Sequence, residues 1–591
     1  MDDARRALRE HFGFEEFRPG QAEAVAAVCS PGRERDVLVV MPTGAGKSLC
    51  YQLPALMRGD LTLVVSPLVS LMQDQVQALE RAAPGRAALV NAQQDPALNR
   101  AALARATAGE LRLLYVAPER FSSPGFLEAI REARIGLFVV DEAHCVSQWG
   151  HDFRPDYFRL ADAARWLGAR AIVASTATAT THVAADIVAR LGLRDPVRVS
   201  TGFDRPNLSF AVVRCATGAD KRRRLLAALR EPGSRPAIVY AGTRTETERL
   251  AADLTRELGT EAVPYHAGLR RDQRAGAQAR FMSGEAEVVV ATNAFGMGID
   301  KADVRTVAHA GVPGSVEAFY QEAGRAGRDG RPARALLFAE ARDKGLHVFF
   351  IQRAEVDDAA IAHVAERLVL RGADGRYDVG VDELGDDHDA VRAIVGHLAR
   401  AGVVQPAPSP VDRLRGRVTA PFDGRARAAC RASAAEGQRA RWRQYRAVWA
   451  FVEGDTCRRA TILRHFGDPS PPRPVVPCCD VCAPELVPAV PAVAGRAGGV
   501  RAAAGGGEDL EAAIVEVVGA ADPSVGRTRA VEILRGGRSK VIAKYAYDGL
   551  PGYGAYAHLT AGEVLARVDG LLAEGRLRST GGHYPKLAVA A

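Results

Sequence analysis

Lysine is scarce in this chain: most of its 78 basic residues are arginines, and Lys47, Lys301 and Lys540 stand out. No run of about 18 apolar residues occurs, which argues against a membrane-spanning helix. Residues 1–14 have the pattern of a charged amphipathic helix and lack the apolar core of a signal peptide. These absences favour a cytoplasmic protein, and the alanine, arginine and glycine content indicates a GC-rich bacterial coding sequence.

Cysteines are also few, with nine in 591 residues, and their spacing does not fit a disulfide framework. Five are scattered and four fall within 457–482, which suits a reduced protein with one metal site. At roughly 100–200 residues per domain the length predicts three to five domains. A net charge of +8 favours a polyanionic partner, with a solvated arginine-rich surface as the alternative.

From about residue 20 to 345, short β-branched apolar runs alternate with helical patterns. Such runs predict buried strands of parallel α/β sheets, because helices cover both faces of such sheets. The polar, proline-containing stretch 203–207 marks the break between two lobes. The predicted strands are 36–40, 61–65, 111–116, 136–140 and 171–175 in the first lobe, and 237–241, 287–291, 305–310 and 333–339 in the second.

Past residue 345 the pattern changes. Residues 359–404 are mostly helical by periodicity, and a wing-like hairpin follows them. Residues 425–466 form long arginine-rich helices that end in the cysteine cluster. The Pro-, Ala- and Gly-rich stretch 484–507 predicts a linker, and 509–591 predicts a compact helical region that ends in a hairpin.

The stretch VVMPTGAGKSLCYQ at 39–52 follows a predicted strand and precedes a helix. In this setting backbone N–H groups and a helix N-terminus cradle phosphates. Lys47 is predicted to pair with the β- and γ-phosphates of a nucleotide, and Ser48 to ligate Mg²⁺. The usual pattern has glycine where this chain has Met41, so Gly44 and Gly46 must form the tight turn.

A second stretch, DEAHCVSQWGHDFRPDYF at 141–158, joins two carboxylates to aromatic rings. Asp141 ends a predicted strand, as a Mg²⁺-binding carboxylate does, and Glu142 is placed to activate water. The side chains that follow can stack on bases and contact phosphates; they are His144, Trp149, His151, Phe153, Arg154, Tyr157 and Phe158. This stretch predicts an ATPase that responds to nucleic acid.

Two further segments extend the nucleotide chemistry. QEAGRAGRDG at 321–330 places Arg325 and Arg328 one helical turn apart, on the same face. Arginines from a second lobe that reach the γ-phosphate would act as arginine fingers, and closure on ATP would then drive movement. STATAT at 175–180 offers hydroxyls that can link the nucleotide site to the neighbouring lobe.

The order FRPGQ, MPTGAGKS, SPLVSLMQDQ, DEAH with QWGHDFRP, STAT, YHAGL, TNAFGMGIDK, QEAGRAGRDG resembles the RecQ family of superfamily 2 DNA helicases over residues 12–340. QWGHDFRP joined to DEAH is the aromatic-rich loop of that family. The resemblance implies an α/β fold with two tandem RecA-like parallel-sheet lobes, a helical zinc-binding segment and a C-terminal winged helix. The implied domains are 1–205 and 206–345 (the lobes), 346–445 (a mostly helical, winged-helix-like insert), 446–485 (zinc segment), 486–508 (linker) and 509–591 (winged helix).

The resemblance also assigns roles to individual residues. Phe14, Arg18 and Gln21 are expected to hold the adenine. The remaining nucleotide residues are Thr43, Gly44, Ala45, Gly46, Lys47 and Ser48 in the phosphate loop, the catalytic pair Asp141 and Glu142, the fingers Arg325 and Arg328, and Asp300 in the loop 291–304. Those expected to sense single-stranded DNA and couple it to hydrolysis are His144, Trp149, Phe153 and Arg154.

The same resemblance implies one structural zinc site in the tail. Cys457 starts a C-R-R helix as in the family, and PCCDVC supplies Cys478, Cys479 and Cys482. Cys479-x-x-Cys482 has a standard zinc spacing, and zinc takes four tetrahedral ligands. Cys478 and Cys479 are adjacent, unlike the usual pattern, so free buried thiols remain the alternative, with His465 as a substitute ligand.

Residues 531–587 resemble the winged helix of RecQ proteins. Arg535, Arg538, Ser539 and Lys540 are expected near DNA phosphates at a helix start. His583 and Tyr584, just past the hairpin turn, are expected to press on the first base pair, unless the hairpin is a structural edge. No further C-terminal helical module of the kind many members carry is expected.

The implied function is an ATP-dependent helicase that moves 3′→5′ on single-stranded DNA and unwinds duplexes in recombination, repair, replication and the SOS response. The alternative is a DNA-stimulated ATPase that remodels or anneals DNA, and loss of unwinding alone on deletion of 509–591 would favour the helicase. An inactive scaffold is disfavoured because Lys47, Asp141 and Glu142 are present, and an RNA helicase because the aromatic loop matches the DNA family. Expected partners are Mg²⁺ with ATP, zinc, and single-stranded or tailed duplex DNA, with a single-strand-binding protein as a candidate; the expected location is the bacterial nucleoid, and the oligomeric state stays open.

Overall fold

The computed structural model contains two compact units, Met1–Pro491 and Ala492–Ala591. Among the described helices, none combines the length and apolar character that crossing a membrane requires. The structure describes residues 1–29, 34–91, 93–147, 157, 159–296, 301–371, 375–407, 409, 412–489, 507–537, 539, 541–542, 545–580 and 586–590.

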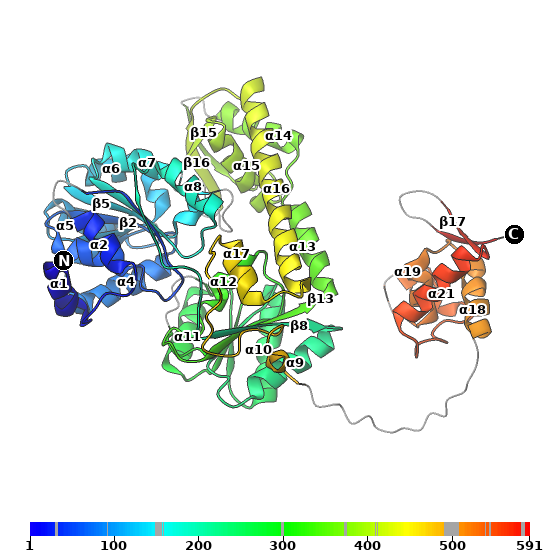
Figure 1. Ribbon diagram of the computed structural model, residues 1–591. Helices are drawn as coiled ribbons and strands as arrows, with labels where there is room; N and C mark the ends of the chain where they lie inside the picture. The colour runs from blue at the N-terminus through cyan, green and yellow to red at the C-terminus, as the bar shows by residue number, and fades with distance from the viewer. Residues whose placement is uncertain are drawn as a thin grey trace. The chain divides into compact units, whose positions relative to one another are not determined.

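A seven-stranded parallel sheet forms the core of the first lobe, in the order β3-β4-β2-β5-β6-β1-β7 (Figure 1). Every residue of its five central strands is buried, and alternate residues of β1 enter separate apolar cores on opposite faces. The strands are β1 (Val37–Val40), β2 (Leu61–Val65), β3 (Ala87–Val90), β4 (Leu113–Val116), β5 (Ile135–Val140), β6 (Ala171–Thr176) and β7 (Val197–Ser200). The helices are α1 (Asp2–Phe12), α2 (Gln21–Cys29), α3 (Leu49–Met57), α4 (Val69–Ala82), α5 (Pro96–Thr107), α6 (Pro124–Ile130), α7 (Leu160–Trp166) and α8 (Thr181–Leu191), with short 3₁₀ turns η1 (Pro118–Ser122) and η2 (Ala143–Val146).

The second lobe is built on a six-stranded parallel sheet in the order β10-β11-β9-β12-β13-β8. Its strands are β8 (Leu208–Cys215), β9 (Ala237–Tyr240), β10 (Ala262–Tyr265), β11 (Val288–Ala291), β12 (Thr306–His309) and β13 (Ala333–Glu340). Hydroxyl side chains of Thr217, Thr243 and Ser315 cap the first, second and last of its helices, which are α9 (Gly218–Arg230), α10 (Arg244–Leu258), α11 (Arg271–Ser283) and α12 (Val316–Ala323). All nine predicted strands are present, and the predicted pair of parallel-sheet lobes is confirmed.

The insert, here called the winged module after its predicted wing-like hairpin, combines helices with a small antiparallel sheet. Helices α14 (Asp358–Arg371) and α15 (His388–Arg400) flank an antiparallel sheet in which β16 (Arg413–Val418) lies between β14 (Arg376–Gly380) and β15 (Val404–Ala407). The predicted wing-like hairpin is therefore β15 with β16. Residues 359–404, which were expected to be mostly helical, also contain β14, because Tyr377 and Val379 alternate with exposed residues and pack into the core of the insert.

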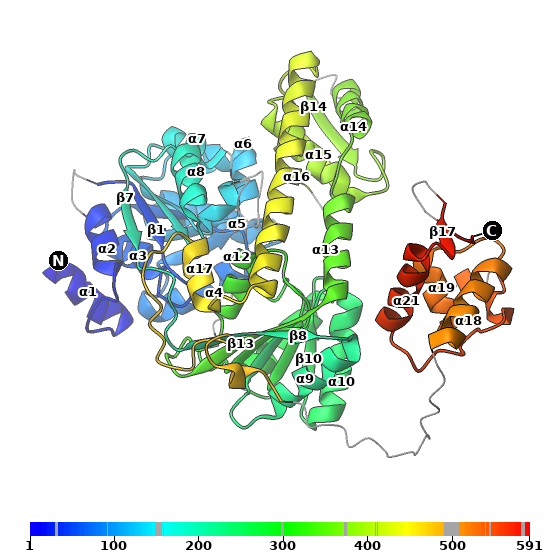
Figure 2. The ribbon, with the colours of Figure 1, turned by 45° about the vertical axis from the view of Figure 1, so that its right-hand side comes forward.

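Two long helices connect this winged module to the second lobe. Figures 1 and 2 both show α13 (Ala341–Arg353) beside α16 (Gly424–Glu453). The predicted boundary at 445 and 446 falls inside α16, so the insert and the zinc segment share one continuous helix. The shorter α17 (Arg458–His465) follows it. The 3₁₀ turn η4 (Pro484–Leu486) lies at the start of the predicted linker 484–507, most of which lies outside the described residues.

The C-terminal unit has its own apolar core. It contains α18 (Gly507–Ala520), α19 (Arg527–Leu534), η5 (Tyr547–Gly549) and α21 (Ala561–Ala573), with β17 (Leu577–Ser579) and β18 (Leu587–Val589). The two strands pair antiparallel, as the predicted terminal hairpin requires.

Candidate active site

Three of the predicted motifs follow three adjacent strands of the first sheet. Strands β5, β6 and β1 are neighbours, and residues 141–142, 177–180 and 41–48 come directly after them. Because these strands are parallel, their carboxyl ends meet at one edge of the sheet, where α/β folds bind ligands. The topology therefore brings the phosphate loop, the carboxylate pair and the STATAT segment together.

The phosphate loop turns on its two glycines. Gly44 and Gly46 have φ values of 85° and 82°, a conformation that glycine adopts without steric cost. Met41 is buried, and its N–H donates to the carbonyl oxygen of Thr176 at 3.2 Å, so this residue continues the sheet and leaves the turn to the glycines. Ser48 is the N-cap of α3, which places the loop where a helix N-terminus favours phosphate.

Arg18 and Gln21 support this loop through hydrogen bonds to its main-chain carbonyl oxygens. Nη1 of Arg18 donates to the carbonyl oxygen of Gly44 at 2.8 Å, and Nε2 of Gln21 donates to that of Gly46 at 3.0 Å. A Cβ at Gly46 would come 2.6 Å from Nε2 of Gln21 and would displace that side chain, and the φ of 82° would strain any other residue. Phe14 is 52% exposed, which leaves its ring accessible to a base. Adenine contacts of these three residues stay a prediction, while the support of the loop by Arg18 and Gln21 is observed.

The carboxylate pair lies in a buried, charged environment. Asp141 and Glu142 are each 8% exposed. Burial, and then the charge of Glu142, raise the pKa of Asp141 to about 7. Burial lowers the pKa of Lys47, while Glu142 and Asp141 oppose that change. Two buried carboxylates beside one ammonium form a donor set that fits Mg²⁺ with a nucleotide, and Asp141 with Ser48 would hold the ion.

His144 connects the carboxylates to the end of β6. Its Nδ1 lies 3.0 Å from Oγ1 of Thr176 and 3.3 Å from Oε2 of Glu142. Glu142 has left-handed backbone angles, φ 47° and ψ 47°, a conformation that costs a non-glycine residue energy and recurs at functional sites. The structure thus places His144 inside the hydrolytic site, and its predicted role in DNA coupling stays a prediction.

The aromatic loop lies outside the described residues, and so do Trp149, Phe153, Arg154 and Asp300. Ser147 and Tyr157, on either side of residues 148–156, are described. Ser147 is buried, and the hydroxyl of Tyr157 donates a hydrogen bond to the main-chain carbonyl oxygen of Asp141 at 3.2 Å. Tyr157 is thereby bonded to the backbone of a catalytic candidate.

Arg328 of the second lobe reaches the phosphate loop. A Cβ at Gly44 would come 3.3 Å from Cγ of Arg328, so this side chain lies over the glycine turn. Arg325 is 3% exposed and lines a cavity of the second lobe together with Tyr240. Helix α12 ends at Ala323, so both arginines lie in the turn that follows it. The prediction that they share one face of a helix is therefore wrong.

Arg205, which the sequence did not single out, joins the two lobes at this point. Its Nη1 donates to the carbonyl oxygens of Thr43 and Gly324, both at 3.0 Å, and its Nη2 to that of Ala326 at 3.0 Å. The guanidinium is buried, and main-chain acceptors satisfy it through charge-assisted hydrogen bonds. Arg205 therefore holds the turn that carries Arg328 against the phosphate loop.

A second buried arginine, Arg459 on α17, supports Arg205 in turn. Its Nη1 donates to the carbonyl oxygen of Arg205 at 2.7 Å and to Oδ1 of Asp204 at 2.5 Å. The adjacent Arg458 pairs with Asp480, with Nη2 and Oδ2 2.9 Å apart. The arginine pair after Cys457 was the only sign of this support in the sequence, and it ties the connection between the lobes to the cysteine cluster.

The four predicted cysteines converge. All four Sγ atoms of Cys457, Cys478, Cys479 and Cys482 lie within 4.8 Å of one another. Sγ of Cys457 is 3.6 Å from that of Cys478 and 3.8 Å from that of Cys479. A Zn–S bond of about 2.3 Å gives a tetrahedral S–S edge of about 3.8 Å, so this group fits zinc, and adjacent Cys478 and Cys479 both reach it. His465 is not in the cluster, since its Nε2 lies 2.7 Å from Oε1 of Glu317.

In the C-terminal unit, two of the predicted DNA residues take part in internal bonds. Nε of Arg535 donates to the carbonyl oxygen of Leu559 at 2.8 Å, and Oγ of Ser539 accepts from Nη1 of Arg529 at 2.9 Å. DNA contacts by Arg535 and Ser539 stay predictions. The other predicted residues, Arg538, Lys540, His583 and Tyr584, lie outside the described residues.

Family profiles match four segments of the chain. They are a DEAD/DEAH box helicase over 18–187, a helicase conserved C-terminal domain over 220–330, a RecQ zinc-binding domain over 423–483 and an RQC domain over 507–591. The zinc-binding match contains all of α16 as well as the four cysteines. It agrees with the continuity of that helix across the predicted boundary.

Two bacterial relatives resemble the chain through its motor. Probable ATP-dependent DNA helicase RecS of Bacillus subtilis (strain 168) is 40% identical over 364 residues, which cover 62% of this chain and 72% of the relative. ATP-dependent DNA helicase RecQ of the same organism is 42% identical over 356 residues, which cover 60% of this chain and 59% of that protein. Among solved structures, the DEAD-box helicase Mss116 bound to ssRNA and UDP-BeF has a TM-score of 0.50 at 17% identity, covers 60% of this chain and 75% of its own, and shows a shared fold.

Proposed function

Because this chain belongs to the RecQ family of ATP-dependent DNA helicases, we propose that it uses ATP hydrolysis to move 3′→5′ along single-stranded DNA and to unwind duplex DNA. The observation that carries this proposal is a nucleotide site to which both lobes contribute. Lys47 and Asp141 come from the first lobe, Arg328 from the second, and Arg205 bonds to main-chain atoms of both. Hydrolysis in a site that both lobes complete is coupled to their movement.

Strand displacement on tailed duplexes tests the proposed function. We expect unwinding that requires Mg²⁺ and ATP on a DNA duplex with a 3′ tail, and little unwinding with a 5′ tail or with an all-RNA duplex of the same sequence. Equal or faster RNA unwinding would overturn the DNA assignment, and preference for the 5′ tail would overturn the direction. Hydrolysis stimulated by single-stranded DNA without strand displacement would favour the remodelling alternative.

The aromatic loop is proposed to couple DNA binding to hydrolysis. Trp149→Ala is expected to keep single-stranded DNA binding, weakened by about five- to tenfold, because stacking of one base is worth roughly 1–3 kcal/mol, the lower end of which is a factor of about five, and the other contacts remain. Stimulation of ATP hydrolysis by DNA, and unwinding, should be lost, since the loop ends at Tyr157, which bonds to Asp141. Steady-state ATPase rates with and without a dT oligonucleotide measure this, and a normal stimulation factor would contradict the coupling role.

We further propose roles in recombination, repair and replication, location at the bacterial nucleoid, and a single-strand-binding protein as a partner. These proposals rest on the family and on the net charge of +8, which suits a polyanion. The pressing of His583 and Tyr584 on the first base pair, and phosphate contacts by residues 535–540, complete the proposed unwinding mechanism. In both of these proposed contacts, the C-terminal unit binds the duplex while the two lobes move along the single strand.

A further inference from the structure

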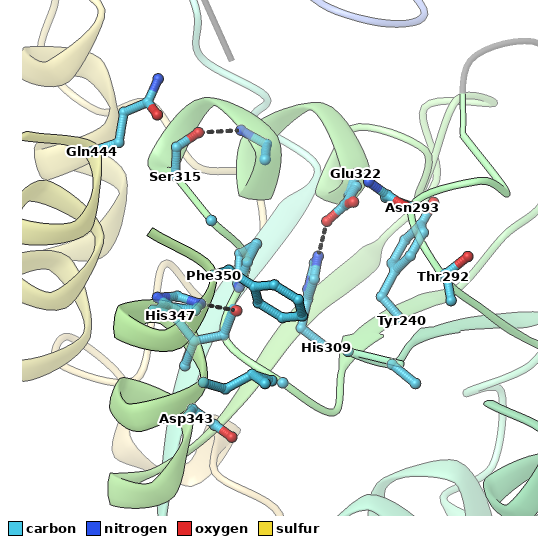
Figure 3. A pocket seen from close by; sticks show the side chains of 18 of the residues that line it. Tyr240, Thr292, Asn293, His309, Ser315, Glu322, Asp343, His347, Phe350 and Gln444 are labelled. Carbon is cyan, nitrogen blue, oxygen red and sulfur yellow. Dashed lines mark hydrogen bonds and ion pairs between the residues drawn. The ribbon is translucent and has the colours of Figure 1, made fainter. Parts of the chain in front are cut away.

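A cavity of about 770 Å³ opens beside the sheet of the second lobe (Figure 3). Tyr240 and His309 end β9 and β12 in its wall, and Thr292 follows β11. Phe350 of α13 and Gln444 of α16 line it as well, so two helices that follow the second lobe in the chain help to enclose it. Leu68 is its lining residue from the first lobe.

The charged residues that line this cavity are two carboxylates and two arginines. Each carboxylate already has a partner: Oε2 of Glu322 lies 2.8 Å from Nε2 of His309, and Oδ2 of Asp343 lies 2.9 Å from Nζ of Lys221. The guanidinium-bearing residues Arg325 and Arg441 also line the cavity.

Arg441 belongs to a group of cations drawn from three helices. Burial, then Arg400 and then Arg441, lower the pKa of His397 to about 4. Burial, with Arg190 and Arg441, lowers the pKa of Arg400 to about 10, and Glu436 opposes the change. Asp186 pairs with Arg190 at 2.8 Å. The three arginines, from α8, α15 and α16, therefore lie near one another, and Asp186 and Glu436 accompany them.

An accessible aromatic side chain accompanies these cations. Phe350 lines the cavity and is 47% exposed, which is unusual for a side chain of its size. Tyr445 also lines it, one residue after Gln444 and four after Arg441, so that all three share one face of α16. Cations that face phosphates, next to rings that face bases, are the combination that binds single-stranded nucleic acid without sequence preference.

We propose that α16 forms a wall of the track for single-stranded DNA, with Arg441 contacting a backbone phosphate and Phe350 stacking on a base. This proposal rests on the proposed function and deepens it, since it makes the long helix shared by the insert and the zinc segment part of the DNA-binding surface. A chain of phosphates suits this surface better than one free nucleotide does, because the arginines that neighbour Arg441 extend beyond the cavity, through Arg400 on α15 to Arg190 on α8.

Arg441→Ala tests the phosphate contact, and Arg446→Ala is its matched control. Arg446 is exposed on the same helix and is not among the residues that line the cavity. In fluorescence anisotropy with a labelled dT oligonucleotide, Arg441→Ala should bind about five- to tenfold more weakly than wild type. The slope of log K against log salt should fall in magnitude by about 0.7, the value for one phosphate on a single strand. Arg446→Ala should stay within about twofold with an unchanged slope.

Phe350→Ala separates stacking from charge. It should weaken binding of the same oligonucleotide about fivefold and leave the salt slope unchanged, because a ring releases no counterions. Arg441→Ala that matches Arg446→Ala in affinity and slope would overturn the proposal, as would a tenfold rise in KM for ATP with normal DNA binding. A wild-type protein without DNA-stimulated ATPase would refute the proposed function itself, whereas normal stimulation in wild type together with wild-type DNA affinity and salt slope in Arg441→Ala refutes only this inference.

Discussion

Lys47→Ala is expected to lower kcat for DNA-stimulated ATP hydrolysis by at least about 100-fold and to abolish unwinding. Removal of a single pre-organised group that stabilises transition-state charge commonly costs 10²–10³ in kcat. Here we expect a larger decrease in kcat than the loss of one contact would cause. The charge of Lys47 also lowers the pKa of Asp141, which burial and Glu142 raise. Without it, Asp141 and Glu142 face each other in a buried site, the pKa of Asp141 rises further, and Mg²⁺ meets a carboxyl that is more often protonated.

The measurement is the steady-state ATPase rate at saturating dT oligonucleotide over a range of Mg²⁺ concentrations. Single-stranded DNA binding and the thermal unfolding temperature should stay close to wild type, since Lys47 lies in a loop that Arg18, Gln21 and Arg205 hold through main-chain atoms. Lys47→Arg is the conservative control, and it should also fail, because a guanidinium does not replace a compact ammonium between two carboxylates. Hydrolysis by Lys47→Ala within tenfold of wild type would contradict the assignment.

Four strands of the two lobes were not predicted from the sequence, and three of them share one physical cause. β3, β7 and β10 are edge strands of the two sheets, and their residues are only partly buried. An edge strand packs on fewer neighbours, so its apolar pattern is weaker, and Pro264 in β10 weakens it again. The central strands were predicted because burial on both faces demands continuous apolar runs.

The fourth missed strand, β8, has the opposite character. It too is an edge strand, yet almost all of its residues are buried. The reason is tertiary: the cysteine segment lies along it, the N–H of Phe210 donates to the carbonyl oxygen of Cys478 at 3.2 Å, and that of Asp480 donates to Phe210 at 3.1 Å. A contact between residues 210 and 479 leaves no periodic signal in either segment.

The residues of the candidate site also differ in whether the sequence could predict them. Lys47, Asp141 and Arg328 belong to local motifs whose chemistry follows from residue type and spacing, so they were predictable. Arg205 acts on main-chain carbonyl oxygens of two distant segments, and any residue type supplies a carbonyl. Its role therefore becomes visible only when the lobes are folded together. The adjacent cysteines were ambiguous for a related reason, because only the folded backbone shows that both thiols reach one point.

The cysteine cluster has a structural consequence that reaches the nucleotide site. Cys479 is 0% exposed, and although burial raises its pKa, hydrogen bonds from the N–H groups of Arg458, Cys482 and Val481 outweigh this and lower it, which prepares a thiolate for metal. Next to it, Asp480 pairs with Arg458 and accepts from the N–H of Val212 in β8 at 3.1 Å. The cluster thereby fixes one edge of the second sheet and the start of α17.

Cys479→Ser is accordingly expected to lose the bound zinc, to lower the unfolding temperature by roughly 5–10 °C and to raise KM for ATP several-fold. Structural zinc contributes roughly 10–16 kcal/mol of binding free energy in small domains, part of which becomes folding free energy. The rise in KM follows because α17 carries Arg459, whose bond to the carbonyl oxygen of Arg205 supports the contact between Arg205 and the phosphate loop. Metal analysis measures the zinc per chain, calorimetry measures the unfolding temperature, and steady-state kinetics measure the KM for ATP.

Cys430→Ser is the matched control, because Cys430 is also 0% exposed but its thiol donates to the carbonyl oxygen of His397 and lies outside the cluster. It makes the same chemical change in a buried thiol, so it should keep one zinc per chain and an unchanged KM for ATP even if it unfolds a few degrees earlier. Cys479→Ser that retains zinc would show that three thiolates suffice. A variant that loses zinc and stability while its KM for ATP equals that of Cys430→Ser would show that the arginine path from α17 to the phosphate loop carries no functional coupling, since loss of packing alone would affect both variants alike.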